Sequence, residues 1–388
     1  MMRIGLLYPT ANPTSPADWS GIPHGLAEGF QRRGMEVVPI PFRMPARIRL
    51  IFSLLRRARG VSKIVAEREP VYAKARSKCI AATLRQLGHL DAVVAMGADL
   101  YDLPLVMHKR SVPVATYDDG NFALFLRYQD SDLHLERYPV EAVKSWAQRQ
   151  AMACKRADVV CVCTDWARKF LVEEFSVPEN KVHVVGVGHR SRSVSPDSRN
   201  WTAPRFLFVG INWKRKNGEA VVEAFARVRE QFPKATLDLV GRHPAIDAPG
   251  VTDHGFLSRE NAHAQKVLDD LFRMATAFVL PSLFEPAGIA YLEAASAGLP
   301  VIGTNRGGAR ELLEGAALSV DPYDRESLVR AMLQLCDMDA ARSMGERARI
   351  RVANSTWEAV SGRMAELLGL FKLRHSNPKS ESANQLIP

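Results

Sequence analysis

Short segments that are almost entirely apolar recur along this chain, and segments with helical periodicity separate them. Strands of a parallel sheet are buried on both faces, so they read as continuous hydrophobic runs. We expect such strands in the first half of the chain at RIGLLY (3–8), EVVPI (36–40), AVVAM (92–96), PVATY (113–117), DVVCVC (158–163) and KVHVV (181–185). A helix expected over residues 21–34 ends at Gly34, a typical C-terminal cap. Residues 1–190 are therefore predicted to form a doubly wound α/β domain.

A second series of apolar runs follows residues 191–204, whose polar composition predicts a linker. These runs are RFLFVG (205–210), TLDLVG (236–241), TAFVLP (276–281), PVIGT (300–304) and ALSV (317–320). A chain of 388 residues is long for one hydrophobic core, which favours two domains. The predicted fold class is α/β, with two facing Rossmann-like doubly wound parallel-sheet domains, residues 1–190 and 205–355, and a cleft between them. We expect a last helix over residues 356–372 and a disordered tail over residues 373–388.

The formal net charge of +10 is concentrated in one segment. Residues 43–78 contain eleven Lys and Arg against two acids, Glu67 and Glu69, and large aliphatic residues lie between them. A basic amphipathic helix of this kind suits an anionic membrane surface. The alternative is a solvated helix face. Nucleic acid is not predicted as a partner, because no nucleic-acid-binding module accompanies the charge.

The cysteines and the start of the chain indicate the compartment. Five cysteines are an odd number without the spacing of a disulfide framework, which favours a reducing environment. The apolar run in MMRIGLLYPT is too short for a signal peptide, and no stretch is long and apolar enough for a membrane span. We therefore expect a cytoplasmic protein, with attachment to the inner face of the cell membrane as an option through residues 43–78.

The segment LFEPAGIAYLEAASAGLPVIGTNRGG (283–308) places two carboxylates, Glu285 and Glu293, around a turn and half a helix. A strand is expected to end just before this turn, at the sheet edge where α/β proteins bind ligands. Free backbone N–H groups at residues 287–289 would form an anion site. Glu293 would lie about 9 Å farther along the helix, which is comparable to the reach from a phosphate to a ribose. The alternatives are a helix cap for Glu285 and a solvated helix face for Glu293.

This pattern resembles the signature of retaining glycosyltransferases of family 4, which have the two-Rossmann B-type fold (GT-B). Four further segments resemble parts of the same family, and the resemblance covers nearly the whole chain: DWSGIPHGLAEGFQRRGMEVV (18–38), ADVVCVCTDWARKFLVEEFSVPENKVHVVGVG (157–188), FLFVGINWKRKNGEAVVEAFARV (206–228) and VTDHGFLSRENAHAQKVLDDLFRMATAFVLPS (251–282). The resemblance implies a nucleotide-sugar donor bound by the second domain and an acceptor bound by the first.

The resemblance also implies residue roles. Lys216, with Arg215 as the second base, would hold the donor diphosphate, and Gly21 lies in the loop that would close over the phosphates. Glu293 matches the carboxylate that binds ribose, and Glu285 the carboxylate near the donor sugar. The backbone at Ala287, Gly288 and Ile289 matches the turn that contacts sugar and phosphate, and the nucleobase would be read around Gly241, Gly255, Phe256 and Leu257. The chain departs from the pattern at Ile211, where the family usually has Arg.

A second departure lies in TYDDGNFALF (116–125), where many family members carry a histidine. The segment resembles a subset with an Asp-x-x-Phe arrangement, here Asp119 to Phe122. Asp119 would bind a hydroxyl of the sugar or the acceptor, or assist proton transfer. The alternative is an aspartate that caps a helix.

The function implied is metal-independent transfer of a sugar, with retention, to an acceptor hydroxyl of a saccharide or of a lipid-linked glycan in polysaccharide or glycoconjugate biosynthesis. No cofactor is expected beyond the nucleotide-sugar substrate. Front-face attack is the expected mechanism, and nucleophilic attack by Glu285 is its rival. Two other functions remain open: a nucleotide-sugar epimerase on the same fold, and a non-catalytic GT-B scaffold. Neither the sugar nor the nucleotide can be read from the sequence.

Overall fold

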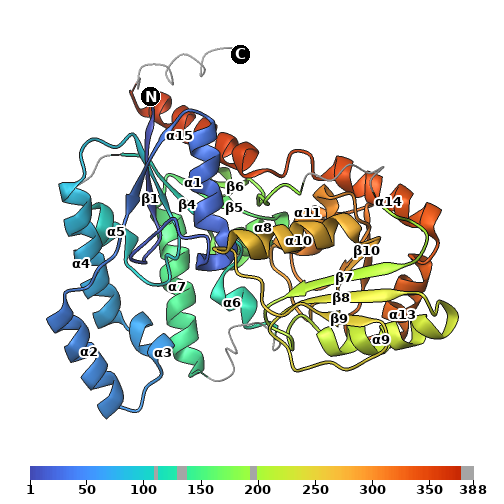
Figure 1. Ribbon diagram of the computed structural model, residues 1–388. Helices are drawn as coiled ribbons and strands as arrows, with labels where there is room; N and C mark the ends of the chain where they lie inside the picture. The colour runs from blue at the N-terminus through green and yellow to red at the C-terminus, as the bar shows by residue number, and fades with distance from the viewer. Residues whose placement is uncertain (109–111, 129–137, 193–198, 377–388) are drawn as a thin grey trace.

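Two α/β domains lie side by side in the computed structural model, which describes residues 1–108, 112–128, 138–192 and 199–376 (Figure 1). Each domain contains a parallel sheet of six strands. The first sheet has the order β2-β1-β3-β4-β5-β6 and consists of β1 (Arg3–Leu7), β2 (Glu36–Ile40), β3 (Ala92–Ala95), β4 (Val114–Asp118), β5 (Val159–Val162) and β6 (Val182–Val184). The second has the order β12-β11-β10-β7-β8-β9 and consists of β7 (Arg205–Gly210), β8 (Thr236–Gly241), β9 (Val251–Asp253), β10 (Ala277–Leu280), β11 (Val301–Thr304) and β12 (Ala317–Val320). The predicted fold class is confirmed.

Helices connect the strands in both domains. In the first domain they are η1 (Asp18–Gly21), α1 (Ile22–Arg32), α2 (Ala46–Ala58), α3 (Lys63–Arg68), α4 (Pro70–Gln86), α5 (Leu103–Met107), α6 (Phe122–Phe125), α7 (Val140–Arg156), α8 (Asp165–Phe175) and η3 (Glu179–Lys181). In the second they are α9 (Gly218–Gln231), α10 (Ala262–Met274), α11 (Ile289–Ser296), α12 (Ala309–Leu312), α13 (Arg325–Gln334) and α14 (Met338–Arg351), and α15 (Trp357–Ser376) follows. Several begin at a side-chain cap, as α8 does where the Thr164 hydroxyl accepts from the backbone N–H of Ala167.

The strand order determines where a ligand site can form. In the second sheet the order reverses between β7 and β10, which are paired neighbours although β8 and β9 intervene in the sequence. Ligands of open α/β sheets bind at such a switch point, beyond the carboxyl ends of the strands. The loop after β7 carries Arg215 and Lys216, and the loop after β10 carries Glu285. Topology therefore brings these three residues to one place.

The last helix returns to the first domain, where α15 packs along α1 (Figure 1). A Cβ on Gly25 or Gly29 of α1 would lie 2.3 Å from atoms of Trp357, so glycine is required for this close packing. The Ser361 hydroxyl donates to the carbonyl oxygen of Leu26 at 3.1 Å. Helix α15 extends to Ser376, so the expectation of disorder from residue 373 is wrong for residues 373–376, and residues 377–388 lie outside the described residues.

The expected linker also needs correction, because Arg192 and Arg199 within it are buried in the second domain. The Arg199 guanidinium donates to backbone carbonyl oxygens at the C-terminal ends of two helices, α10 and α11: Phe272, Ala297 and Gly298. A cation at this end satisfies carbonyl groups that have no partner within the helix and complements the helix dipole. Residues 193–198 lie outside the described residues.

The basic segment 43–78 contains α2, α3 and the start of α4. No residue of α2 or α3 is buried, and α2 lies at the end of the first domain that is farthest from the second (Figure 1). Among the described residues, none of the helices has the length and apolar character needed to cross a bilayer.

Candidate functional site

Glu285 lies in the loop between β10 and α11, and its carboxylate is buried against two cations. Lys216 Nζ contacts Oε2, and Arg215 Nη1 lies 3.4 Å from the same oxygen. The Ser282 hydroxyl donates to that oxygen at 3.1 Å. Burial alone would raise the pKa of Glu285, but the two cations and the hydroxyl lower it to about 2. Glu285 is therefore ionised at neutral pH and fixed in position.

The N-terminus of α11 adjoins this cluster. Gly288 caps the helix with φ of 56°, and its N–H donates to Glu285 Oε1 at 3.4 Å, so Glu285 binds the capping residue and does not itself cap the helix. A Cβ on Gly288 would lie 2.7 Å from Tyr291 and 2.8 Å from Ala309. Only glycine fits here, because the protein itself fills the space beside this turn. The first N–H groups of α11 are left for an anion.

Glu293 projects from the same helix and is 2% exposed. Arg192 Nη2 lies 3.3 Å from its Oε2, and Arg259 Nη1 lies 3.6 Å from its Oε1. Burial alone would raise the pKa of Glu293, but Arg192 and Arg259 lower it. No hydrogen-bond donor of the described residues reaches Oε1. The alternative of a solvated helix face is therefore wrong, and one carboxylate oxygen retains its capacity to accept a hydrogen bond.

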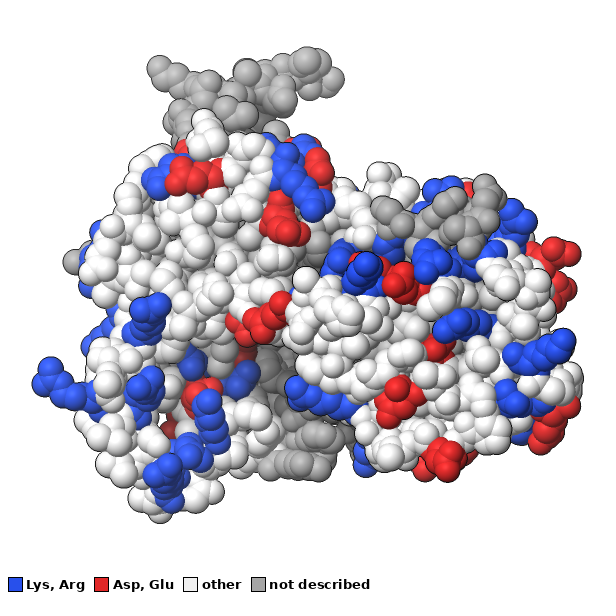
Figure 2. Space-filling model, in the orientation of Figure 1, with Lys and Arg blue, Asp and Glu red and all other residues white. Residues whose placement is uncertain are grey.

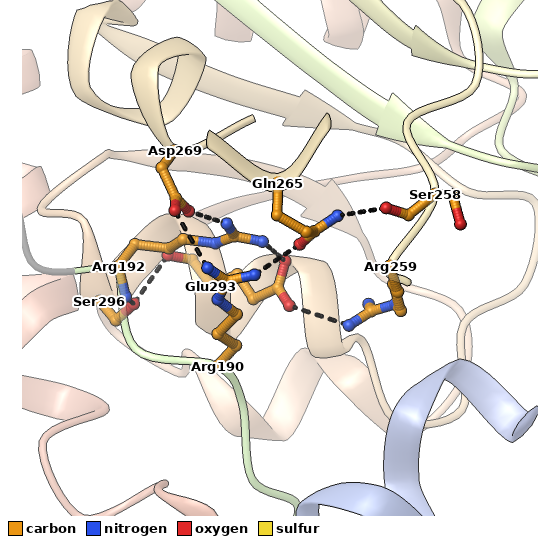
Figure 3. Close-up of polar contacts among 8 residues, drawn as sticks. All are labelled: Arg190, Arg192, Ser258, Arg259, Gln265, Asp269, Glu293 and Ser296. Atoms are coloured by element: carbon orange, nitrogen blue, oxygen red, sulfur yellow. Dashed lines mark hydrogen bonds and ion pairs between the residues drawn. The ribbon is translucent and has the colours of Figure 1, made fainter. Parts of the chain in front are cut away.

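A polar network holds Arg192 in place (Figure 3). Its guanidinium contacts Asp269, and Arg190 binds the same carboxylate at 3.1 Å. Arg190 also donates to Gln265 Oε1 at 2.7 Å. In Figure 3, Arg192 and Arg259 approach Glu293 from opposite sides. Arg192 comes from the segment that leads out of the first domain, so this segment supplies part of the site.

The first domain contributes the loop that precedes α1. Trp19, Ser20 and Gly21 all have positive φ, of 40°, 56° and 82°. Such a run is strained for the two non-glycine residues, and strain of this kind collects at functional sites. A Cβ on Gly21 would lie 3.6 Å from Nη1 of Arg259, which belongs to the second domain. The loop therefore reaches across the cleft to the partners of Glu293.

Asp118 ends β4 in the first domain and Asp119 follows it, and their surroundings differ from those of Glu285. Gln150 donates to Asp118 through its side-chain amide. Burial, together with the negative charge of Glu285, raises the pKa of Asp119 to about 6, although a hydrogen bond from Trp19 opposes the shift. Burial and Asp119 raise the pKa of Asp118 as well. The negative charge of Glu285 thus acts on Asp119 of the other domain, and the pKa of Asp119 is closer to neutral pH than that of an ordinary aspartate.

The residues expected to read the nucleobase lie together beyond β8. Gly241 has φ of 148°, and its N–H donates to the carbonyl oxygen of Gly255 at 2.9 Å. A Cβ on Gly241 would lie 1.8 Å from the carbonyl oxygen of Gly210, so this backbone contact requires glycine. Phe256 is exposed and lies under the guanidinium of Arg242, 4.5 Å from the ring centroid, whereas Leu257 packs against the core.

A cavity of about 590 Å³ opens between the two domains. Its lining combines Gly21 and His24 of the first domain with Arg259 and Ile289 of the second. His189, in the connection between the domains, also lines it. The cleft predicted from the sequence is thus present and meets the N-terminus of α11.

The site residues proposed from the sequence form two groups. Lys216, Arg215, Glu285 and the α11 turn are in contact, and the charge of Glu285 acts on Asp119 of the first domain. Glu293 lies farther along α11 with its own arginines. Sequence reasoning missed Arg192 and Arg259. Arg192 lies in a segment whose polar composition is typical of a linker. The one signal in the sequence is that it follows Arg190 by two residues. Arg259 lies two residues after Leu257, the last residue of the expected nucleobase segment.

Comparison with known proteins shows similarity in the sequence of the second domain and in the fold of both domains. Residues 203–338 match the model of the family described as glycosyl transferases group 1. A sucrose-phosphate synthase from Thermosynechococcus elongatus has a similar structure, with a TM-score of 0.71 and 18% sequence identity over 96% of this chain and 100% of that chain. The second domain is thus similar to glycosyl transferases group 1, and the two domains together have a GT-B fold. The narrower assignment to family 4 stays a prediction.

The curated relatives match over parts of their length. Mannosylfructose-phosphate synthase of Agrobacterium fabrum is 25% identical over 272 residues, which is 63% of this chain and 59% of that protein. Sucrose-phosphate synthase of Spinacia oleracea is 26% identical over 181 residues, which is 38% of this chain and 17% of that protein. The match thus spans less than two thirds of either relative.

Proposed function

We propose that this protein transfers a sugar from a nucleoside diphosphate donor to an acceptor hydroxyl, with retention at the anomeric carbon. The observation that carries the proposal is the cluster of Lys216, Arg215 and Glu285 beside the N-terminus of α11. Two cations and a helix N-terminus would neutralise the charge of a departing diphosphate, as Lys, Arg and backbone N–H groups do elsewhere. The match to group 1 glycosyl transferases supports the same class of reaction.

The donor would lie along α11. Glu293 would accept ribose hydroxyls through its available oxygen, and the backbone at Gly241 and Gly255 would contact the base. Because Lys216 and Arg215 already supply positive charge at the diphosphate, we propose a reaction that requires neither a metal ion nor a further cofactor.

Front-face attack is the mechanism that these charges favour. The bond between the anomeric carbon and the β-phosphate oxygen breaks, and the acceptor oxygen bonds to the same face of that carbon. Glu285, with a pKa of about 2 and Lys216 in contact, is a weak nucleophile. The acceptor proton passes to the leaving phosphate oxygen or to Asp119, whose pKa of about 6 suits a base near neutral pH.

The acceptor would bind in the first domain. A cavity of about 710 Å³ there combines aromatic, charged and hydroxyl side chains, a lining that suits sugars: Arg59, Ser62, Arg68, Tyr138, Ser145 and Trp146. The Trp146 ring lies 5.7 Å from the ring of Phe122, in the segment that begins at Asp119. We propose a saccharide or a lipid-linked glycan of polysaccharide or glycoconjugate biosynthesis as acceptor. A lipid-linked acceptor would place a cytoplasmic protein at the inner face of the cell membrane, through residues 43–78.

The test is a thermal-stability titration with the diphosphates and nucleotide sugars of uridine, guanosine, adenosine and thymidine. A ligand at a hundred times its Kd should add about 2.7 kcal/mol of stability. We expect one nucleotide class to stabilise the wild type and to lose most of this effect in Lys216→Ala and Glu293→Ala. Stabilisation by none of them would contradict the proposal and favour a non-catalytic scaffold. Interconversion of a nucleotide sugar without an acceptor would instead indicate an epimerase.

A further inference from the structure

Helix α2 turns its most apolar face away from the protein. Four large aliphatic residues on it are between 52% and 61% exposed: Leu50, Ile51, Leu54 and Leu55. The opposite face is partly buried at Ile48, Phe52 and Arg56, which recur every four residues, and the Phe52 ring packs 4.6 Å from Tyr72. A surface helix of a globular protein normally buries its apolar face and exposes its polar face. Contiguous exposed apolar groups of this kind indicate an interaction surface.

The surroundings of this face are strongly basic. From Val37 to Ala66 the chain has no acidic residue and seven basic ones: Arg43, Arg47, Arg49, Arg56, Arg57, Arg59 and Lys63. In Figure 2, many Lys and Arg side chains lie at the lower left, where Figure 1 places α2. The occupant of the surface must therefore be both apolar and anionic.

We propose that the exposed face of α2 docks on an anionic lipid bilayer. Aliphatic side chains that enter the headgroup region, with arginines beside them, are the pattern of interfacial helices. A second copy of this chain fits less well, because the same face on both partners would bring their arginines together. A bilayer at α2 would be the source of the proposed lipid-linked acceptor, and this part of the inference rests on the proposed function. Lipid binding itself can be measured without substrates.

The position of α2 is consistent with this role. The chain that leaves α2 forms one wall of the cavity proposed for the acceptor, at Arg59, Gly60, Val61 and Ser62. A headgroup entering that cavity would come from the bilayer on which α2 lies.

The experiment measures co-flotation of the purified full chain with vesicles of phosphatidylcholine alone or with about a third phosphatidylglycerol. We expect at least tenfold stronger binding to the anionic vesicles. The double variant Leu50→Ser/Leu54→Ser should bind at least tenfold more weakly, and Arg47→Gln/Arg57→Gln should lose the preference for anionic lipid. Binding of the wild type should also weaken at high salt, because exposed charges are screened.

The matched control is Ile350→Ser in α14. Ile350 is 63% exposed and lies between Arg349 and Arg351, but it belongs to the second domain. Its loss should change vesicle binding less than twofold. Equal losses in the control and the α2 variant would overturn the inference, as would failure of the wild type to bind anionic vesicles. Self-association that Leu50→Ser/Leu54→Ser abolishes, without lipid binding, would assign the face to a second copy.

Donor binding separates this inference from the proposed function. All variants should keep the melting temperature of the wild type and its stabilisation by nucleotide, because α2 does not touch the donor cluster. Vesicle binding without nucleotide binding would refute the proposed function alone, and the opposite result would refute the lipid surface alone.

Discussion

The carboxylates on the two sides of the cleft have opposite electrostatic surroundings. In the second domain, Glu285 and Glu293 each pair with two cations, and their pKa values are lowered. In the first domain, Asp118 accepts from Gln150, Asp119 is hydrogen-bonded to Asp118 and Trp19, and the pKa values of both aspartates are raised. The difference suggests a division of labour: one side holds fixed charges that position an anion, and the other carries a group that exchanges a proton near neutral pH.

Loss of the fixed charge should have the largest effect. We expect Lys216→Ala to lower kcat/KM about a thousandfold, because a positioned cation at a leaving group contributes this much in comparable sites. Without Lys216, the pKa of buried Glu285 should rise. The cluster would then lose both the cation that neutralises the leaving group and the fixed negative charge of Glu285. Steady-state kinetics with the stabilising nucleotide sugar would measure this. Lys214→Ala, at an exposed position two residues earlier, is the control and should stay within twofold.

Removal of the titrating group should have the next largest effect. We expect Asp119→Asn to lower kcat about a hundredfold, the scale of general-base assistance. In the wild type the rate should fall as the pH drops below about 6, because protonated Asp119 cannot accept the proton. The variant should lose this dependence. If the rate of the variant still fell at low pH, a group other than Asp119 would be titrating. The contrast between the carboxylates on the two sides of the cleft would then not hold.

Arg192 tests whether the cations of the second domain position Glu293. Arg192→Met should raise the donor KM about tenfold with little change in kcat, because Glu293 loses one of its two partners. Arg199→Met removes a second buried arginine of the same segment, which donates to backbone carbonyls and lies over the ring of Trp201, away from Glu293. Both variants should lower thermal stability. If both also raised KM equally, the effect of Arg192 would be structural and unrelated to Glu293.

A chelator should have the smallest effect. The described residues contain no group of three or more His, Cys, Asp or Glu suited to a metal ion. If Lys216 and Arg215 neutralise the leaving group, incubation with EDTA should change the transfer rate less than twofold. A large loss that Mg²⁺ or Mn²⁺ restores would show that the fixed cations are insufficient.

The sequence predicts the strands of both domains better than the side-chain contacts between distant segments. The apolar runs mark eleven of the twelve strands, and β9 (Val251–Asp253) was missed because it is short and polar at an edge. Glu285-x7-Glu293 and Lys216 lie in continuous segments, so their arrangement follows from local order. The partners of Glu293 could not be predicted, because Arg192 reaches it across about a hundred residues through tertiary packing. The exposure of the aliphatic face of α2 could not be predicted either, because periodicity does not tell which face of a helix is buried.

The chain crosses between the domains twice, and the two crossings lie together. His189 on the way out is bridged to Thr356 on the way back, just before α15. Two adjacent crossings restrain the domains more than a single connection would. Phe284 of the second domain also packs against Phe125, Tyr128 and Trp166 of the first, so any opening of the cleft has to separate these rings. The indole fluorescence of Trp166 would therefore change whenever the domains part.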